Sequence, residues 1–167
     1  KGLSSASSII FVPDQYLASY VSRKTGREFI VWPGYCPIHA AISEKDIEEA
    51  IALHPRAEML VHPECRPEVT EKADQVLSTE GMCRYVKSSP GDEFIIGTEV
   101  GILHRLQKEN PAKHFYPVKE EMMCPDMKKI NLEKIALALR EMKYEVELPP
   151  SIIQKAALSI ERMLQFT

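Results

Sequence analysis

Short apolar segments alternate with amphipathic segments along nearly the whole chain, and this alternation constrains the fold more than any other feature. Runs of three or four apolar residues are too short for helices, and a proline soon after several of them ends the strand, because proline lacks the N–H that a sheet needs. The predicted strands are residues 9–12, 29–32, 59–61, 94–96 and 114–116, with a weaker edge strand at 144–148. Alternating strands and helices are typical of βαβ units, so we expect an α/β fold with a mainly parallel sheet.

Helix start signals fall between these strands. Asp14, Asn131 and the capping-box pairs Ser43 with Asp46 and Ser151 with Gln154 precede apolar faces at helical spacing. After Pro67, apolar residues at 69, 73, 76 and 77 predict one helix that runs to about residue 77.

Composition narrows the class of protein. With 167 residues the chain has room for one good core or two small ones, and 44% hydrophobic and 27% charged residues are ordinary values for a globular protein. The net charge of −3 argues against nucleic-acid binding. We expect no membrane span, because no apolar run approaches about 18 residues. The chain begins without Met, so we expect a fragment of a longer protein.

Four scattered cysteines, with no secretory signal, favour reduced thiols or metal ligands over disulfides. They are Cys36, Cys65, Cys83 and Cys124. This pattern predicts a cytoplasmic protein.

One stretch places two titratable side chains just after a strand. Pro63 ends the strand that precedes it, so His62 and Glu64 lie at the strand's carboxyl end, where open α/β sheets bind ligands. One interpretation is that the two side chains form an acid/base or ligand-binding pair. The other is a structural turn in which Glu64 caps the next helix and the hydrogen bonds of His62 are satisfied within the protein. The residues alone do not decide between these interpretations.

The chain also contains a repeat. Residues 9–46 and 94–131 each show a strand, an acidic turn, a helix, a second strand, a proline, a Cys-Pro pair and a helix cap. Cys36 and Cys124 each precede the cap by seven residues. Equivalent loops that converge could supply two thiolates to a metal or cluster, with a further ligand from His39, from Cys65 or from upstream residues. The alternative is a pair of buried, inert cysteines.

Several stretches carry a resemblance to a known family. They are Val12-Pro13-Asp14, Gly34-Tyr35-Cys36-Pro37-Ile38-His39, Val61-His62-Pro63-Glu64-Cys65, Ser78-Thr79-Glu80-Gly81-Met82, Gly97-Thr98-Glu99 and Cys124-Pro125-Asp126-Met127. In this order they resemble quinolinate synthase, an iron–sulfur enzyme family of NAD biosynthesis, over nearly all of the chain.

The resemblance implies repeated three-layer α/β/α domains with short, mainly parallel sheets around a pseudo-threefold axis. Residues 1–42 would form the C-terminal part of the second domain, and residues 43–167 the third domain with a C-terminal helix. The first domain would be absent from this chain, which alone would be incomplete as an enzyme.

The resemblance also implies the metal site. Cys36 and Cys124 would be two of the three cysteine ligands of a [4Fe-4S] cluster, with the third upstream of this chain. Cys65 is not implied as a ligand.

The implied substrate pocket lies around the same loops. His62 and Glu64 would bind iminoaspartate and its intermediates, with Glu64 the leading acid/base and Pro63 contributing its backbone. Thr79 would bind an anionic group, and His39 would line the pocket.

The implied activity is that of a transferase that condenses iminoaspartate with dihydroxyacetone phosphate to quinolinate, with the cluster as Lewis acid. An aspartate-oxidising enzyme or dehydrogenase would supply the imine. One alternative is a zinc-stabilised α/β module that binds a partner and catalyses nothing. A nucleotide-binding domain is the other, although no G-x-G-x-x-G follows a strand.

Overall fold

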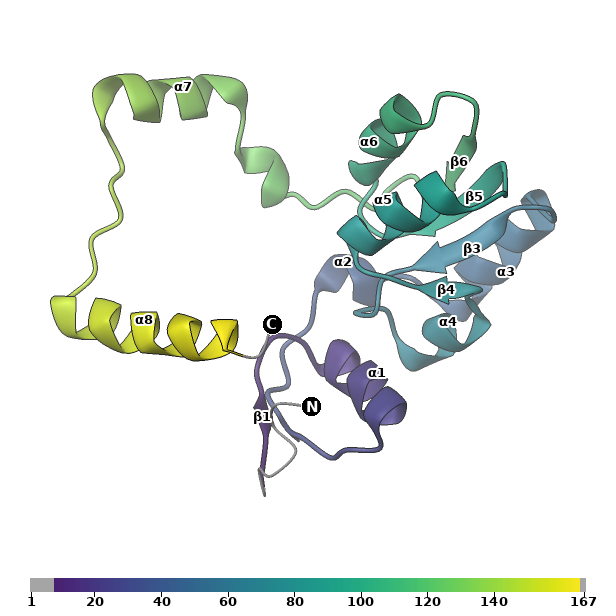
Figure 1. The fold of residues 1–167 in the computed structure, drawn as a ribbon. Helices are drawn as coiled ribbons and strands as arrows, with labels where there is room; N and C mark the ends of the chain where they lie inside the picture. The colour runs from purple at the N-terminus through teal and green to yellow at the C-terminus, as the bar shows by residue number, and fades with distance from the viewer. Residues whose placement is uncertain (1–7, 166–167) are drawn as a thin grey trace. The chain divides into compact units, whose positions relative to one another are not determined.

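The computed structural model describes residues 8–165, which form two compact units divided between Pro125 and Asp126 (Figure 1). The first unit contains β1 (Ile10–Phe11), α1 (Gln15–Thr25), β2 (Ile30–Val31), α2 (Pro37–Ala40), α3 (Glu44–Leu53), β3 (Glu58–Val61), α4 (Pro67–Lys72), β4 (Gln75–Val76), α5 (Thr79–Ser88), β5 (Glu93–Gly97), α6 (Ile102–Glu109) and β6 (His114–Pro117). The second contains a 3₁₀ turn (Met127–Lys129), α7 (Leu132–Glu141) and α8 (Pro150–Leu164).

Every strand pairing in the described residues is parallel. β1 pairs with β2, and a four-stranded sheet has the order β4-β3-β5-β6. The predicted α/β class with short parallel sheets is therefore confirmed. The pseudo-threefold arrangement and the domain boundary near residue 42 concern the intact protein and stay predictions.

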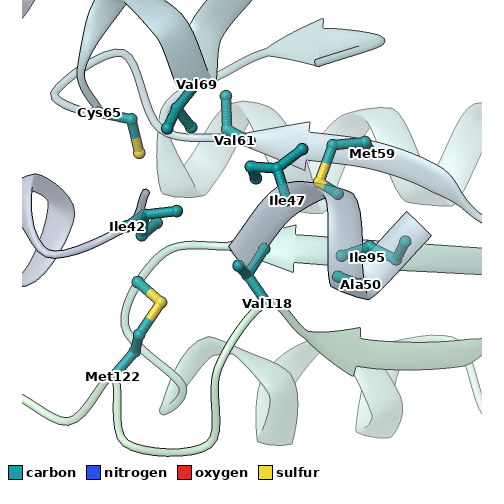
Figure 2. Packing of buried hydrophobic residues seen from close by; sticks show 10 residues of the cluster. All are labelled: Ile42, Ile47, Ala50, Met59, Val61, Cys65, Val69, Ile95, Val118 and Met122. Atoms are coloured by element: carbon teal, nitrogen blue, oxygen red, sulfur yellow. The ribbon is translucent and has the colours of Figure 1, made fainter. Parts of the chain in front are cut away.

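The four-stranded sheet has a hydrophobic core on each face, because successive side chains of a strand point to opposite sides. Met59 and Val61 of β3 pack with Ile47 and Ala50 of α3 on one face, which Figure 2 shows from close by. Leu60 packs on the other face. Helices α3 and α4 contribute to the first core and α5 and α6 to the second, so this sheet is the middle of three layers.

Local caps explain where several helices begin. Ser43 and Asp46 form the predicted capping box of α3, and the Asn131 side chain accepts a hydrogen bond from the Lys134 amide at the start of α7. The box predicted at Ser151 is wrong, because α8 begins at Pro150 with Pro149 as its N-cap.

The structure corrects two predictions of secondary structure, one of a helix and one of a strand. The helix predicted to reach residue 77 ends at Lys72, and Gln75–Val76 form β4 instead, paired with β3. The edge strand predicted at 144–148 does not form. Met142 and Tyr144 have φ angles of 50° and 64°, and such left-handed residues interrupt an extended strand.

In the described residues, no helix combines the length and the apolar character that crossing a membrane requires.

The end of β5 places a glycine where the sheet has no room for a side chain. Gly97 pairs with Val61, and a Cβ atom at residue 97 would lie 2.8 Å from Val61 Cγ1. Only a glycine lets the end of β5 lie this close to β3 without displacing a core side chain.

We predict that Gly97→Ala lowers the free energy of unfolding by roughly 1–3 kcal/mol, the usual cost of overpacking a core. Val61→Ala removes the clashing methyl groups, so the double variant should be less destabilised than the sum of the two single variants. Urea unfolding of the four proteins measures this coupling. Strictly additive effects would show that the clash is absent.

Candidate functional site

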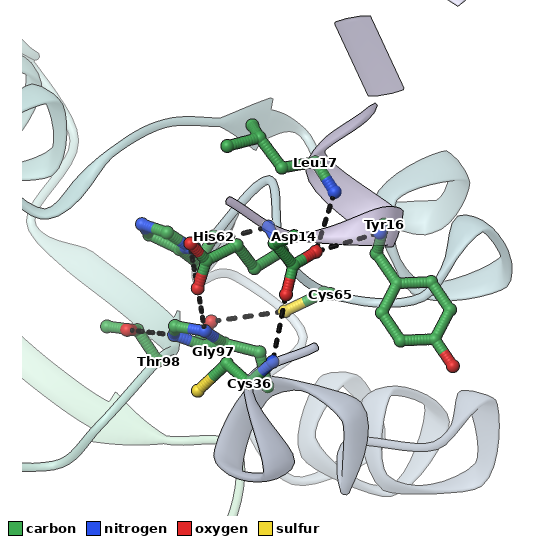
Figure 3. A network of polar contacts seen from close by, with 10 residues as sticks. Asp14, Tyr16, Leu17, Cys36, His62, Cys65, Gly97 and Thr98 are labelled. Carbon is green, nitrogen blue, oxygen red and sulfur yellow. Dashed lines mark hydrogen bonds and ion pairs between the residues drawn. The ribbon is translucent and has the colours of Figure 1, made fainter. Parts of the chain in front are cut away.

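The loop that carries Cys36 is held by a buried carboxylate. Asp14, 2% exposed, caps α1 by accepting hydrogen bonds from the amides of Tyr16 and Leu17 at 2.7 and 2.9 Å. Its second oxygen accepts from the Cys36 amide at 2.8 Å, as Figure 3 shows. Cys36 in turn is the N-cap of the short helix α2.

The second half of the repeat uses the same contact. Glu99 follows β5 as Asp14 follows β1, and its carboxylate accepts from the Cys124 amide at 3.3 Å and from the Gly101 amide at 2.8 Å. The equivalence of Cys36 and Cys124, predicted from spacing, therefore has a structural counterpart. In each module, the carboxylate after the first strand accepts a hydrogen bond from the cysteine amide of the later loop.

The four cysteines differ in their surroundings. Cys36 and Cys124 are half-buried, whereas Cys65 and Cys83 are buried. The Cys65 thiol donates to the Gly97 carbonyl at 3.6 Å, and burial raises its pKa to about 12. Within residues 8–165, neither the Cys36 nor the Cys124 sulfur has a hydrogen-bond partner in the protein. These two thiols are therefore more accessible than those of Cys65 and Cys83, and their role as ligands stays a prediction.

The turn after β3 brings a carboxylate against two imidazoles. Glu64 Oε2 lies 2.9 Å from His39 Nδ1 and 3.7 Å from His62 Nδ1. The two rings stack with centroids 4.3 Å apart and planes 11° apart. The His62 amide donates to the Gly97 carbonyl at 3.1 Å, which fixes the turn to β5. Pro63 lies between the two predicted side chains.

The burial of this cluster shifts its protonation. Burial lowers the pKa of His39, an effect that the charge of Asp14 partly offsets. Burial, with His39 adding to it, lowers the pKa of His62 to about 4. Burial raises the pKa of Glu64. Near pH 7 both imidazoles are therefore neutral, and Glu64 takes up a proton more readily than an exposed glutamate.

The donor atoms limit which metal sites are feasible. One ligand atom each from Cys36, His39 and Glu64 lies within 4.8 Å of the others, a spacing that could hold a metal ion. Both ring nitrogens of His39, however, already have partners: Glu64 on Nδ1 and Thr98 Oγ1 on Nε2, at 2.8 Å. Among the described residues, the Cys36 thiol has no hydrogen-bond partner, whereas His39 has no free nitrogen to offer a metal. Two unpartnered thiols on equivalent loops fit thiolate ligation of an iron–sulfur cluster.

Among the described residues, the structure shows no contact of Thr79 or of Cys124 with the other predicted site residues, and Cys124 is linked to the site only through Glu99. Thr79 lies furthest from the predicted role. It is the first residue of α5, it is exposed, and in the described part of the chain its hydroxyl has no hydrogen bond to the other predicted site residues. Its role stays a prediction.

Two polar residues of the site were not singled out for it from the sequence. Asp14 was recognised as a helix cap, but its bond to Cys36 spans 22 residues and follows from the fold. Thr98 is 1% exposed and touches His39 across 59 residues. The repeat, which aligns Asp14 with Glu99, was the signal that could have identified the first, and no local pattern identifies the second.

The chain is similar to proteins of one known family over nearly its whole length. The model of the family described as Quinolinate synthetase A protein matches residues 1–165. Quinolinate synthases of Thermodesulfovibrio yellowstonii and Methanosarcina barkeri are 52% and 46% identical to the chain over 159 residues, which is 95% of it. The quinolinate synthase of Thermus thermophilus is 44% identical over 165 residues, 93% of the chain. The chain spans about half the length of these relatives, 52% in each case.

We predict that alkylating reagents distinguish the buried from the half-buried thiols. In cluster-free protein at pH 8, Cys36 and Cys124 should be modified while Cys65 is not, because a thiol with a pKa of about 12 is roughly one part in 10⁴ thiolate at that pH. Labelling of Cys65 should begin as the pH rises toward 12. Mass spectrometry of peptides after timed iodoacetamide treatment measures this order, and equal labelling of Cys65 and Cys36 at pH 8 would contradict it.

Proposed function

This chain belongs to the Quinolinate synthetase A family, and from that premise we propose that the full-length protein is a quinolinate synthase of NAD biosynthesis. It condenses iminoaspartate with dihydroxyacetone phosphate, and quinolinate, phosphate and two waters leave. The observation that carries the proposal is the matched anchoring of the Cys36 and Cys124 loops by Asp14 and Glu99, with Cys36 close to the His39–Glu64 pair. The enzyme acts as a transferase in the cytoplasm, and an aspartate-oxidising enzyme or dehydrogenase supplies the imine.

Cys36 and Cys124 are two of three thiolates that hold a [4Fe-4S] cluster, and the third comes from outside this chain. Bound there, the cluster supplies a Lewis acid that polarises an oxygen or nitrogen of the substrate. The other roles that we assign to this chain, substrate binding and proton transfer, are carried out by its own side chains.

Glu64 moves protons during the two dehydrations. A general base must lie within hydrogen-bond reach of its proton, and its pKa should lie near the working pH. The proline-flanked turn, bonded to β5, holds the carboxylate in place, and its raised pKa brings it closer to that range. Pro63 contributes only its backbone to this turn.

His62 binds the substrate through a defined nitrogen. The Glu64 amide lies 3.3 Å from His62 Nδ1 and donates to it, so in the neutral ring the proton is on Nε2. Nε2–H has no partner among the described residues and is free to donate to a carboxylate or carbonyl oxygen of the substrate. His39 lines the same pocket, and Thr79 binds an anionic group from the start of α5.

The alternative is a zinc-stabilised module without activity, which the proximity of Cys36, His39 and Glu64 would favour. Against it, both nitrogens of His39 are occupied within the protein. Metal and acid-labile sulfide analysis of anaerobically purified full-length protein separates the two functions. Iron with equimolar sulfide supports the cluster, and zinc without sulfide supports the alternative.

We predict that Cys36→Ala and Cys124→Ala each abolish cluster binding and quinolinate formation in the full-length protein, because each removes one of three protein ligands. Cys65→Ala and Cys83→Ala are the matched controls. Both remove buried thiols that lie outside the ligand set, so iron content should stay near that of the wild type. A fully loaded Cys36→Ala protein would end the ligand assignment.

We predict that Glu64→Gln keeps the cluster and substrate binding but slows turnover roughly 10²–10⁴-fold, the range for loss of a general acid/base. Glutamine keeps the size of the side chain and can still contact His39, whereas it cannot take up a proton. Single-turnover assays on cluster-loaded protein measure the chemical step separately from binding. Turnover within a few-fold of wild type would exclude the acid/base role, and weaker binding with an unchanged chemical step would make Glu64 a positioning residue.

A further inference from the structure

His39 is held at both ring nitrogens. Nδ1 lies 2.9 Å from a carboxylate oxygen of Glu64, and Nε2 lies 2.8 Å from the hydroxyl of Thr98. His39 is 8% exposed and Thr98 is 1% exposed, so bulk water does not compete readily for either contact. The ring is also stacked on His62.

The chemistry of the partners sets the direction of both hydrogen bonds. A carboxylate oxygen can only accept, so the proton of the neutral ring is on Nδ1 and is donated to Glu64. Nε2 is then the unprotonated nitrogen, and the Thr98 hydroxyl donates to it. The Thr98 hydroxyl therefore favours the tautomer of His39 in which Nδ1 carries the proton and donates it to the Glu64 carboxylate.

Thr98 itself is fixed by the sheet. It follows Gly97, the last residue of β5, whose carbonyl accepts a hydrogen bond from the His62 amide. Figure 3 shows Thr98 beside Gly97, at one edge of the polar network. The hydroxyl is thereby attached to the same strand end that positions the His62–Glu64 turn.

We propose that Thr98 is a positioning residue of the reaction: its hydroxyl holds the His39 ring in the orientation in which Nδ1–H fixes the Glu64 carboxylate. The inference rests on the proposed function, in which Glu64 transfers protons. Without the hydroxyl, Nε2 is a buried acceptor with no partner, and nothing on that side holds the ring in place. The ring then shifts, the Nδ1–Glu64 bond weakens, and the carboxylate becomes less well placed.

The test compares Thr98→Val with Thr98→Ser in the full-length, cluster-loaded enzyme. Valine keeps the branched shape and removes the hydroxyl, whereas serine keeps the hydroxyl. We expect kcat of the valine variant to fall roughly 10–100-fold, as for a small misplacement of a reacting group, with KM little changed because His62 and Thr79 remain. The serine variant should stay within a few-fold of wild type. Thr98→Ala, which cannot clash, is the second hydroxyl-free variant and should behave like valine.

Thr70→Val is the matched control. Thr70 is also a buried threonine whose hydroxyl is hydrogen-bonded, to Arg23 and to the Pro67 carbonyl in α4, away from the cluster of imidazoles. Its replacement should leave kcat unchanged. A loss of kcat in Thr70→Val equal to that in Thr98→Val would reduce the effect to general destabilisation and overturn the proposal.

A second measurement does not depend on activity. In full-length protein labelled with ¹⁵N-histidine, the unprotonated His39 Nε2 should resonate downfield in Thr98→Val and near its wild-type position in Thr98→Ser. An unchanged Nε2 resonance, or a valine variant with wild-type kcat, would overturn the proposal. If the wild-type protein forms no quinolinate while the Thr98→Val variant still shows the Nε2 shift, the proposed function is refuted and the Thr98–His39 bond is established.

Discussion

The site depends on three consecutive residues at the end of β5, which are Gly97, the last residue of the strand, and Thr98 and Glu99, which follow it. The Gly97 carbonyl accepts from the His62 amide, the Thr98 hydroxyl bonds His39, and the Glu99 carboxylate accepts from the Cys124 amide. One segment thereby contacts the three loops that carry the functional side chains. Because β5 is a central strand with buried side chains on both faces, this segment inherits the rigidity of the core. Precise placement of a site requires this kind of support.

The repeated carboxylate-to-amide contact explains how two modules deliver equivalent cysteines. Asp14 belongs to the two-stranded module and Glu99 to the four-stranded one, and both bind the amide of the cysteine in the later loop. A hydrogen bond from an amide to a carboxylate is stronger than one between neutral groups and is directional, so it fixes the backbone while the sulfur stays free. The backbone amide of each cysteine therefore holds the loop in place, and the sulfur atom makes no contact that is needed for this.

Sequence reasoning predicted the features that local pattern determines. The strand and helix alternation, the capping box at Ser43 and the matched cysteines all follow from spacing and residue type. Sequence reasoning failed where contacts between residues far apart in the sequence determine the local structure. β4 is two residues long and exists because β3 offers a free edge, and the error at 144–148 arose because Met142 and Tyr144 rarely adopt left-handed backbone. Thr98 after a strand looks like any turn residue, since its partner lies 59 positions away.

The charges around Glu64 limit what the described residues can bind by themselves. Burial raises the pKa of Glu64 and lowers the pKa values of both histidines, and the negative charge of the buried Asp14 acts upward on all three. The imidazoles stay neutral because burial outweighs that effect. Asp14, His39 and His62, the described groups that act on Glu64 or lie against it, therefore carry negative or no charge. If the site binds the two anionic substrates proposed above, it needs positive charge at the same place. Under the proposed ligation, a metal held by Cys36 and Cys124 would supply part of that charge, and the remainder would have to come from other residues around the site.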